Sequence, residues 1–311
     1  MKSPLRWLLE EGSHTERVEY HLGRAPPEVG LKRANRLEVL LRSARRRLPS
    51  PDKWPYQLGL RAVPNTLPQV LCIGAQKAGT TWLYENLARH PEVFVPPEVK
   101  EVHYFDFLFH HPLADYAEVF AAGRGQVRCD ITPNYGRLRA ERIRFCHRVM
   151  PDARLIFLMR NPVERAWSQA VMDLAKRSNR RFEDVPAEDF QKHFRSPSIR
   201  GNGGYCDMID RWLAVYRREQ LFVGFFEEVT RDPRALLTRI FRHIGVSEDV
   251  RWEDFPLTER IHAGLGAPLP DAYRVSLEEI FAPEIERLAR RFGGCESSRL
   301  VRPEWLGSSL P

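Results

Sequence analysis

One strand-to-helix corner restricts the possible folds of this chain more than any other feature of its sequence. In "VLCIGAQKAGTTWLYENL", residues 70–87, an apolar β-type run ends at Gly74, a turn continues to Gly79, and a helical pattern begins at Thr80. A loop in this position directs backbone N–H groups and the positive end of the helix dipole toward an anion. The sequence therefore predicts an anion site at this corner.

The residues of this corner favour an anion that is held without a metal ion. Lys77 adds a positive charge, and the hydroxyls of Thr80 and Thr81 can donate hydrogen bonds. In ATP-binding loops the lysine follows the second glycine directly, whereas Lys77 lies between the two glycines. The apolar run at 154–159 is also followed by Arg160 and not by an aspartate that would hold magnesium through a water. We therefore expect no metal at this site.

A second strand-to-helix corner predicts a second anion site. In "LMRNPVERAWSQA", residues 158–170, Asn161 suits the N-cap and Pro162 suits the first helical position. Arg160 lies at the mouth of the preceding strand, and Ser168 follows Asn161 by about two helical turns, so it can share a ligand with Arg160. Two such sites suggest a ligand with a phosphate at each end of a nucleoside.

Short apolar runs alternate with longer helical patterns from about residue 67 onward. This alternation predicts an α/β fold, with a mostly parallel central β-sheet and helices on both faces, which binds ligands at the carboxyl ends of its strands. Residues 178–204 interrupt the pattern, and we interpret them as an insertion or a mobile lid. The expected strands lie at 69–74, 92–96, 154–160 and 221–229, and the expected helices lie at 80–90, 162–177 and 233–245.

We expect two structural units, an N-terminal helical arm at 1–66 and a main domain at 67–311. Leucine and alanine recur at helical spacing over 31–44, opposite a face of lysine and arginine. Two interpretations remain for this amphipathic helix. Its basic face could bind an acidic partner or a membrane surface, or its apolar face could pack on the main domain.

The charge of the chain is informative only together with its motifs. A formal net charge of +7 and a pI near 9.3 favour anionic ligands, although an arginine-rich composition has the same effect. We expect no nucleic-acid binding, because no known module is present and the arginine runs are not interleaved with aromatic residues.

The cysteines and the apolar segments bear on the compartment. Five scattered cysteines form no Cys-x-x-Cys pair, so we expect reduced thiols and neither a disulfide framework nor a zinc site. The N-terminal segment has no apolar run suited to a secretory signal, and no stretch has the apolar length of a membrane span. We expect a cytoplasmic protein without a transmembrane segment.

The ordered motifs resemble those of sulfotransferases that use 3′-phosphoadenosine 5′-phosphosulfate (PAPS). "IGAQKAGTTWL" and "RNPVERAWSQ" are similar to the phosphosulfate-binding and 3′-phosphate-binding motifs of that family, and the resemblance covers roughly residues 67–295. It implies a P-loop-NTPase-like fold and PAPS as the donor. It also implies a set of donor-binding residues, namely Gln76, Lys77, Ala78, Gly79, Thr80, Thr81 and Trp82 for the 5′-phosphosulfate and Arg160 and Ser168 for the 3′-phosphate.

The segment "PPEVKEVHYFD", residues 96–106, supplies the candidate bases. It is similar to the Glu-Val-His-Phe-Phe-Asp segment of the heparan sulfate branch, the carbohydrate-modifying branch that this bacterial-type sequence resembles most in its motifs. The resemblance implies that Glu101 is the catalytic base and that Lys77 stabilises the leaving phosphate. His103 is the alternative base, because an unperturbed imidazole titrates near neutral pH. Asp106 could anchor the loop.

Further expectations concern positions later in the chain. In "CDITPNY", Asp130 and Tyr135 are candidate cleft residues, and Ile131 stands where polysaccharide-modifying relatives often have lysine. Tyr205 is either a ring that packs against the adenine or a tyrosine of the core. The loop that would close over the 3′-phosphate has Arg260 as its nearby cation.

The expected reaction transfers a sulfuryl group from PAPS to a hydroxyl, or less readily to an amine, and releases 3′,5′-adenosine bisphosphate (PAP). The acceptor class stays open among carbohydrate, lipid headgroup and natural product, and so does a homodimer as the assembly. Two other functions also remain open. A P-loop small-molecule kinase would need magnesium, and a catalytically silent nucleotide-binding protein would transfer no sulfate.

Overall fold

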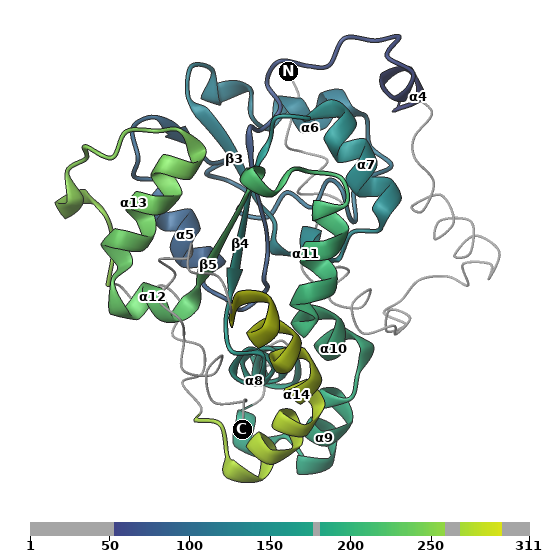
Figure 1. The fold of residues 1–311 in the computed structure, drawn as a ribbon, viewed down its shortest axis with the longest axis vertical. Coiled ribbons are helices and arrows are strands. Elements are labelled where there is room, and N and C mark those ends of the chain that lie inside the picture. Colours follow the sequence, from purple (N-terminus) through teal and green to yellow (C-terminus); the bar gives the residue numbers. More distant parts are fainter. Residues whose placement is uncertain (1–52, 177–180, 259–267, 294–311) are drawn as a thin grey trace, which may run out of the picture.

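A parallel sheet of five strands forms the centre of the molecule (Figure 1). The computed structural model describes residues 53–176, 181–258 and 268–293. The strands lie in the order β2-β3-β1-β4-β5, and all neighbouring pairs are parallel, which confirms the predicted sheet. The strands are β1 (Val70–Gly74), β2 (Val93–Phe94), β3 (Val127–Ile131), β4 (Arg154–Met159) and β5 (Leu221–Phe225).

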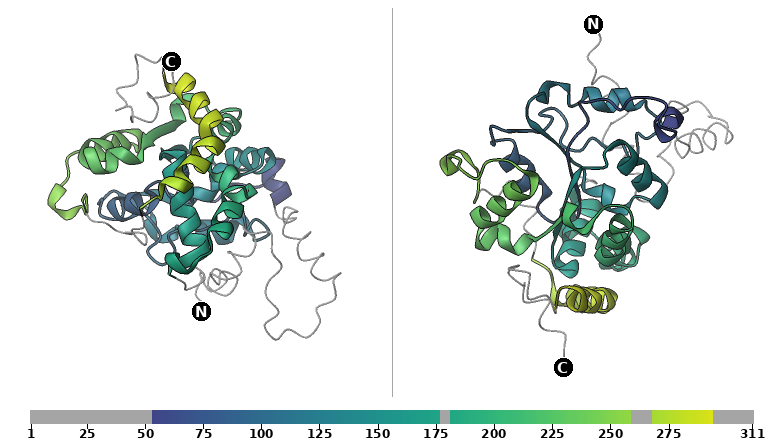
Figure 2. Two further views of the ribbon diagram at one scale, coloured as in Figure 1. Left: turned by 90° about the horizontal axis from the view of Figure 1, so that it is seen from below. Right: turned by 45° about the horizontal axis from the view of Figure 1, so that its top comes forward.

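Helices cover both faces of the sheet, as predicted (Figure 1). One face carries α5 (Thr80–Leu87), α12 (Phe226–Arg231) and α13 (Pro233–Ile244), and the other carries α7 (Ala140–Val149) and α11 (Tyr205–Leu213). A third group lies beyond the carboxyl ends of the strands (Figure 2) and comprises α8 (Pro162–Val171), α9 (Ala187–Phe194), α10 (Pro197–Gly203) and α14 (Asp271–Gly293).

Shorter elements complete the described chain. A π-helical turn, Met172–Lys176, continues α8. The other short helices are α4 (Lys53–Gln57), α6 (Leu113–Glu118), η1 (Ala121–Gly123), η2 (Pro133–Arg137), η4 (Phe182–Asp184), η5 (Arg218–Gln220) and η6 (Trp252–Asp254).

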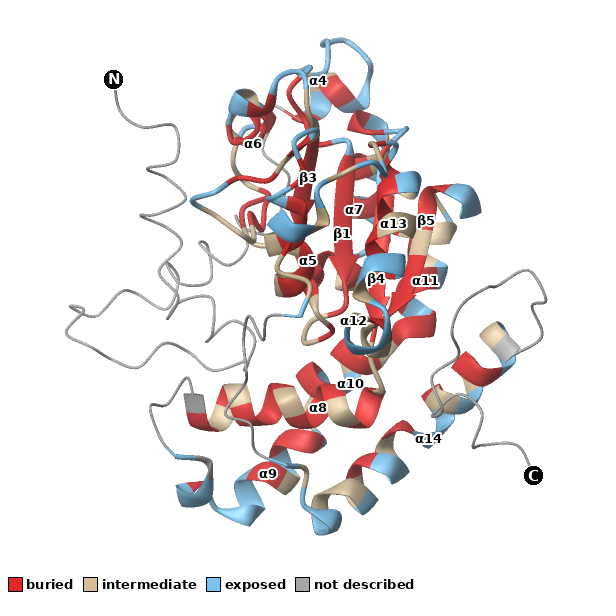
Figure 3. Ribbon diagram, turned by 90° about the vertical axis from the view of Figure 1, so that its left-hand side faces the viewer, coloured by how far each residue is buried: buried red, intermediate tan, exposed pale blue. Residues whose placement is uncertain are grey.

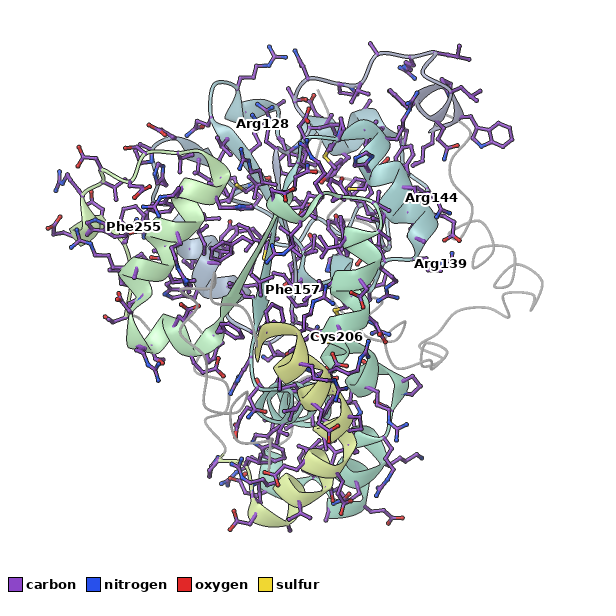
Figure 4. The ribbon with its side chains drawn as sticks, in the orientation of Figure 1. Arg128, Arg139, Arg144, Phe157, Cys206 and Phe255 are labelled. Atoms are coloured by element: carbon purple, nitrogen blue, oxygen red, sulfur yellow. The ribbon has the colours of Figure 1, made fainter. Side chains whose placement is uncertain are left out.

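The strands form the buried core (Figure 3). β1 is buried at every position, which is typical of a parallel sheet between two helix layers. Its last residue must be glycine, because a Cβ atom on Gly74 would lie 2.4 Å from the ring of Phe157 on β4. Phe157 lies at the centre of the molecule (Figure 4). The close packing of Gly74 against its ring fixes the point at which the following loop begins.

α9 and α10 pack against α8 and α14, so this part of 178–204 is not a mobile loop, whereas the alternative interpretation, an insertion, stays a prediction. The many polar residues of the stretch favour a loop in the sequence. The two phenylalanines of α9, however, are four residues apart and therefore share one helix face. A second apolar core joins α8, α9, α10 and α14 and includes Trp167, Phe190, Phe194, Ile199 and Phe281.

The sequence patterns also miss one strand and overextend another. They do not predict β3, because Arg128 and Asp130 interrupt its apolar pattern, yet both side chains are buried and hydrogen-bonded (Figure 4 labels Arg128). β5 ends at Phe225 and not at residue 229, because Glu228 accepts a hydrogen bond from the N–H of Phe225 and so begins α12.

Several predictions concern residues outside the described ranges. They include the amphipathic helix at 31–44, Arg260 and Cys295, and most of the expected arm, so the domain boundary at residue 66 stays a prediction. The four described cysteines are free and buried. No helix of the described chain is both long enough and apolar enough to cross a membrane.

Candidate active site

Residues 74–79, from the last residue of β1 to the residue before α5, form the first predicted corner, which we call the anion loop. Gly79 has a φ of 90°, and a Cβ atom there would lie 2.9 Å from the ring of Phe226, so glycine is required on both counts. α5 begins without a side-chain cap, and within the described chain the N–H groups of Gly79, Thr80 and Thr81 donate to no other backbone group. These N–H groups are therefore available to an anion.

The side chains that follow the loop are also available to a ligand. Within the described chain, the hydroxyls of Thr80 and Thr81 make no hydrogen bond to a protein group. Lys77 lies in the left-handed region with a φ of 69°, and its Nζ is 3.7 Å from Sδ of Met172. The corner thus combines one ammonium group, two hydroxyls and a helix N-terminus, as the sequence predicted.

The other predicted residues of this corner have partners within the protein. Oε1 of Gln76 accepts a hydrogen bond of 2.8 Å from Nδ2 of Asn202, which ties the loop to α10. Ala78 is buried and can offer only its backbone. Trp82 is also buried, and its Nε1 donates to the carbonyl oxygen of Leu257. We therefore expect these three residues to shape the loop rather than to contact a ligand through their side chains.

The second predicted corner lies beside the anion loop, because β4 pairs with β1. Asn161 caps α8 by accepting a hydrogen bond of 2.9 Å from the N–H of Val163, and Pro162 is the first residue of the helix, as predicted. Nη1 of Arg160 lies 3.5 Å from the carbonyl oxygen of Lys77. The guanidinium of Arg160 therefore joins the two corners.

Arg160 and Ser168 retain groups for a ligand. The guanidinium of Arg160 lies over the ring of Phe226, with Cζ 4.8 Å from the ring centroid, and its Nη2 is 3.9 Å from Oε2 of Glu164. Burial lowers the pKa of Arg160, and the charge of Glu164 opposes that shift. Ser168 lies one turn beyond Glu164 on the same helix face, and its hydroxyl has no protein partner in the described chain.

Tyr205 is a residue of the core, which was the second of its two interpretations. Its side chain is fully buried, and its ring packs edge-on against that of Phe157. The hydroxyl donates to the carbonyl oxygen of Arg160 at 3.0 Å. In this arrangement the ring offers no surface to an adenine, so Tyr205 would act on a nucleotide only by positioning Arg160.

Residues 101–106, which we call the base loop, contain a hydrogen-bonded chain of three side chains. Nε2 of His103 lies 3.2 Å from Oε2 of Glu101, and Nδ1 of His103 lies 2.7 Å from Oδ2 of Asp106. Nζ of Lys100 lies 2.9 Å from the other oxygen of Glu101. The side chain of Glu101 is 31% exposed and that of His103 only 8%, so Glu101 is the member that a second molecule can reach.

The charges in this chain stabilise one another. Burial alone would raise the pKa of Glu101, but hydrogen bonds from His103 and Lys100 hold it well below its usual range. Burial alone would lower the pKa of His103, but the carboxylates of Asp106 and Glu101 raise it to about 9. At neutral pH the imidazole is therefore protonated and donates from both nitrogens, so it has no lone pair to accept a proton.

Asp106 anchors the base loop, in line with the expectation from the sequence. Its carboxylate accepts hydrogen bonds from Nδ2 of Asn134 and from the N–H of Phe107. Arg142 on α7 donates to the carbonyl oxygens of Phe105 and Asp106. Sequence reasoning missed Asn134 and Arg142. The first stands in the "CDITPNY" segment that it singled out, whereas nothing in the sequence marks the second.

Asp130 and Tyr135 are not cleft residues, because both are fully buried. Asp130 accepts hydrogen bonds from the hydroxyls of Thr132, Tyr116 and Tyr135. Burial raises the pKa of Asp130 to about 6, although these three hydrogen bonds oppose the shift. A carboxylate at the end of a strand suggests exposure in the sequence, but the hydroxyls that allow its burial come from separate segments.

The described residues do not form a metal site. No group of three or more His, Cys, Asp or Glu side chains in the described ranges could hold a metal ion. Asp130 is the carboxylate on the strand next to β1, and both of its oxygens are occupied by the three hydroxyls.

A comparison with family models matches residues 67–255 to the "Sulfotransferase domain" family. Among curated proteins, heparan sulfate glucosamine 3-O-sulfotransferase 6 of Homo sapiens is 30% identical over 194 residues, which cover 60% of this chain and 55% of that protein. Heparan sulfate glucosamine 3-O-sulfotransferase 3B1 of Mus musculus is 29% identical over 198 residues, which cover 61% and 49%. The chain thus spans about half the length of these relatives.

A similar fold is found in a solved structure, that of a sulfotransferase from Alicyclobacillus acidocaldarius. The TM-score is 0.59 and the identity is 26%, and the match covers 74% of this chain and 97% of that one. The family match includes the anion loop, the second corner and the base loop, which lie at the carboxyl end of the parallel sheet. The chain therefore belongs to the sulfotransferase domain family.

Proposed function

We propose that this protein transfers the sulfuryl group of PAPS to a hydroxyl, or less readily to an amine, and releases PAP. The supporting observation is that the two anion-binding corners follow the adjacent strands β1 and β4, and that the base loop is hydrogen-bonded at the carboxyl end of β3, the strand on the other side of β1. The Arg160–Lys77 contact joins the two corners. The base loop is bonded to Thr132, whose N–H donates to the carbonyl oxygen of Cys72 on β1.

The donor would be held at its two charged ends. Lys77, Thr80 and Thr81, together with the free N–H groups that begin α5, fit the 5′-phosphosulfate. Arg160 and Ser168 fit the 3′-phosphate. As the bond between sulfur and the bridging phosphate oxygen breaks, negative charge develops on that oxygen, and the ammonium of Lys77 would stabilise it.

Glu101 is the better candidate for the base. It is ionised and partly exposed, whereas His103 is protonated at neutral pH and is nearly buried. The oxygen of the acceptor hydroxyl would form the new bond to sulfur, and the proton of that hydroxyl would pass to Glu101. Because its pKa is low, Glu101 is a weak base, so this transfer fits a late stage at which the hydroxyl has become strongly acidic.

A sugar hydroxyl is the first acceptor to test, because the curated relatives are named for glucosamine in heparan sulfate. The position where polysaccharide-modifying relatives often have lysine is occupied by Ile131, which is 1% exposed. It adds no charge for a densely sulfated chain. We therefore keep neutral sugars, lipid headgroups and hydroxylated natural products in the acceptor panel.

The test is transfer of labelled sulfate from PAPS to this panel, with sulfated products identified by mass spectrometry. We expect one acceptor class to gain a sulfuryl group while PAP is released in equal amount, with the same rate in a metal chelator. A requirement for magnesium and transfer from ATP would instead support a kinase. Tight PAP binding without any product would support a catalytically silent protein.

A further inference from the structure

We infer that Asp130 is a positioning residue that sets the conformation of the base loop through two intervening hydroxyl groups. The inference deepens the proposed function, since it rests on Glu101 and His103 as part of the reacting site. Asp130 itself is fully buried on β3 and contacts no residue of the base loop directly among its described hydrogen bonds.

Asp130 forms the inner layer of this arrangement with Thr132 and Tyr135. Oγ1 of Thr132 donates to Oδ1 of Asp130 at 2.6 Å. The hydroxyl of Tyr135 donates to Oδ2 of Asp130 at 2.9 Å. Both hydroxyls therefore direct their single proton toward the carboxylate.

The same two hydroxyl oxygens accept hydrogen bonds from four consecutive N–H groups of the base loop. Oγ1 of Thr132 accepts from Val102 at 3.0 Å and from His103 at 3.4 Å. The Tyr135 hydroxyl accepts from Tyr104 at 2.8 Å and from Phe105 at 3.4 Å. These four N–H groups include every backbone N–H between Glu101 and Asp106, the two carboxylates of the hydrogen-bonded chain.

The chemistry of the hydroxyl group explains why a carboxylate is needed behind it. A hydroxyl has one proton to donate and lone pairs to accept with. An ionised carboxylate only accepts, so it keeps each proton on its own side and leaves the lone pairs to the backbone N–H groups. A neutral amide in its place could donate to one of the hydroxyls, which would then have to turn its proton toward the base loop.

The base loop needs this support because its backbone is strained. His103 has a φ of 57°, in the left-handed region that residues with a Cβ atom seldom adopt. Such a conformation persists only where the surroundings impose it. The hydrogen bonds from the N–H groups of Val102, His103 and Tyr104 lie on both sides of this residue and hold its imidazole between the two carboxylates.

Tyr116 provides a matched control for Tyr135. Its hydroxyl donates to the same oxygen of Asp130, at 2.8 Å, but accepts none of the base-loop hydrogen bonds of the described structure. Tyr116→Phe and Tyr135→Phe therefore each remove one hydrogen bond from Asp130 and keep the ring. Only Tyr135→Phe removes an acceptor from the base loop.

The test compares these two variants of the full chain by amide hydrogen exchange. We expect exchange at residues 104 and 105 to be about tenfold faster in Tyr135→Phe, as for the loss of one net hydrogen bond, and to change less than about twofold in Tyr116→Phe. Equal exchange in the two variants, or no change in Tyr135→Phe, would overturn the inference.

A second pair of variants, at Thr132, tests the same inference if Tyr135→Phe fails to fold. Thr132→Val removes the hydroxyl that serves Val102 and His103, whereas Thr132→Ser retains it. We expect faster exchange at residues 102 and 103 in Thr132→Val and near wild-type exchange in Thr132→Ser. Near wild-type exchange in Thr132→Val together with faster exchange in Thr132→Ser would show that the methyl packing, and not the hydroxyl, holds the loop.

The exchange measurement needs neither donor nor acceptor, so it separates this inference from the proposed function. Where sulfuryl transfer is measurable, we expect kcat to fall about tenfold in Tyr135→Phe with PAP affinity unchanged, and to stay within about twofold in Tyr116→Phe. If the two variants differ in exchange as expected but the protein transfers no sulfate, the positioning role of Asp130 is supported and the proposed reaction is wrong. A kcat equal in the two variants would remove the positioning role and retain the reaction.

Discussion

The anion loop and the base loop lie at neighbouring strand ends but differ in how their polar groups are satisfied. Around the anion loop, Thr80, Thr81 and Ser168 have no hydrogen-bond partner for their hydroxyls within the described chain. In the base loop, Glu101, His103 and Asp106 bond to one another, and the backbone between them bonds to two further hydroxyls. One region is prepared for a ligand, and the other is already complete without one.

The difference indicates how each region would contribute to catalysis. Groups without protein partners can exchange water for a charged ligand at little cost, which suits binding and release of a nucleotide. Groups that are fixed before the reaction need no reorganisation when the proton moves, which suits a base. Binding and chemistry would then be divided between the two regions, and substitutions in each should separate the two effects.

The largest effect is expected for Glu101→Gln, in the base loop. The amide cannot accept the proton, so kcat should fall about 10³-fold, while PAP affinity measured by calorimetry should stay within about twofold of wild type. His103→Gln should reduce kcat less, because His103 only orients and ionises the base. A wild-type rate in Glu101→Gln together with an inactive His103→Gln would move the base to His103.

A smaller effect on the rate, and a larger one on binding, is expected for Lys77→Ala in the anion loop. Loss of the ammonium should lower kcat about 10²-fold, because charge on the leaving oxygen is no longer stabilised, and should weaken PAP binding about fivefold. Arg139→Ala, an exposed cation labelled in Figure 4, is the control for net charge and should change neither. If kcat were unchanged and PAP binding were lost, Lys77 would bind the nucleotide without stabilising the leaving oxygen.

The two regions also differ in how well their structure can be predicted from the sequence. The anion loop follows from local rules, because Gly74, Gly79 and the start of α5 lie close together in the chain, and the cap and first turn of α8 follow from local rules in the same way. The parallel sheet follows from the same local alternation of strand and helix. Contacts within a few residues determine these features, and the sequence shows them.

The support of the base loop could not be predicted in this way. Its partners Asp130, Thr132 and Tyr135 lie about 30 residues away from the loop, and Arg142 lies on α7. Their burial depends on a strand, β3, whose polar residues hide it from pattern analysis. For the same reason the sequence placed Asp130 and Tyr135 in a cleft. Buried hydrogen-bond networks connect distant segments, and no local pattern records them.

His103 in the base loop should make the free energy of unfolding depend on pH. The folded-state pKa of His103 is raised from 6.5 to about 9, so its contribution is fully present below pH 6.5 and is lost as the pH rises through 9. We expect the free energy of unfolding to fall by about 3 kcal/mol over this window. His103→Gln, measured by urea denaturation at the same pH values, should lack that part of the slope. A parallel slope in the variant would show that other groups cause it.

The smallest effect, and the most direct test of the contrast, is expected for Ser168→Ala. Because the Ser168 hydroxyl has no protein partner in the described chain, its removal should leave the free energy of unfolding of the ligand-free protein within about 0.5 kcal/mol of wild type. It should nonetheless weaken PAP binding about fivefold, by the loss of one charge-assisted hydrogen bond.

Thr132→Ala is the counterpart of Ser168→Ala on the other side of the contrast. Its hydroxyl is buried and bonded to both Asp130 and the base loop, so the substitution should cost about 2 kcal/mol of stability and leave PAP affinity unchanged. Calorimetry and urea denaturation of the two variants therefore give opposite results if the division holds. The two results should differ because a hydroxyl that already bonds within the protein has no hydrogen bond left for a ligand. If both variants lost stability, or both lost affinity, the hydroxyls of the two regions would not differ in function.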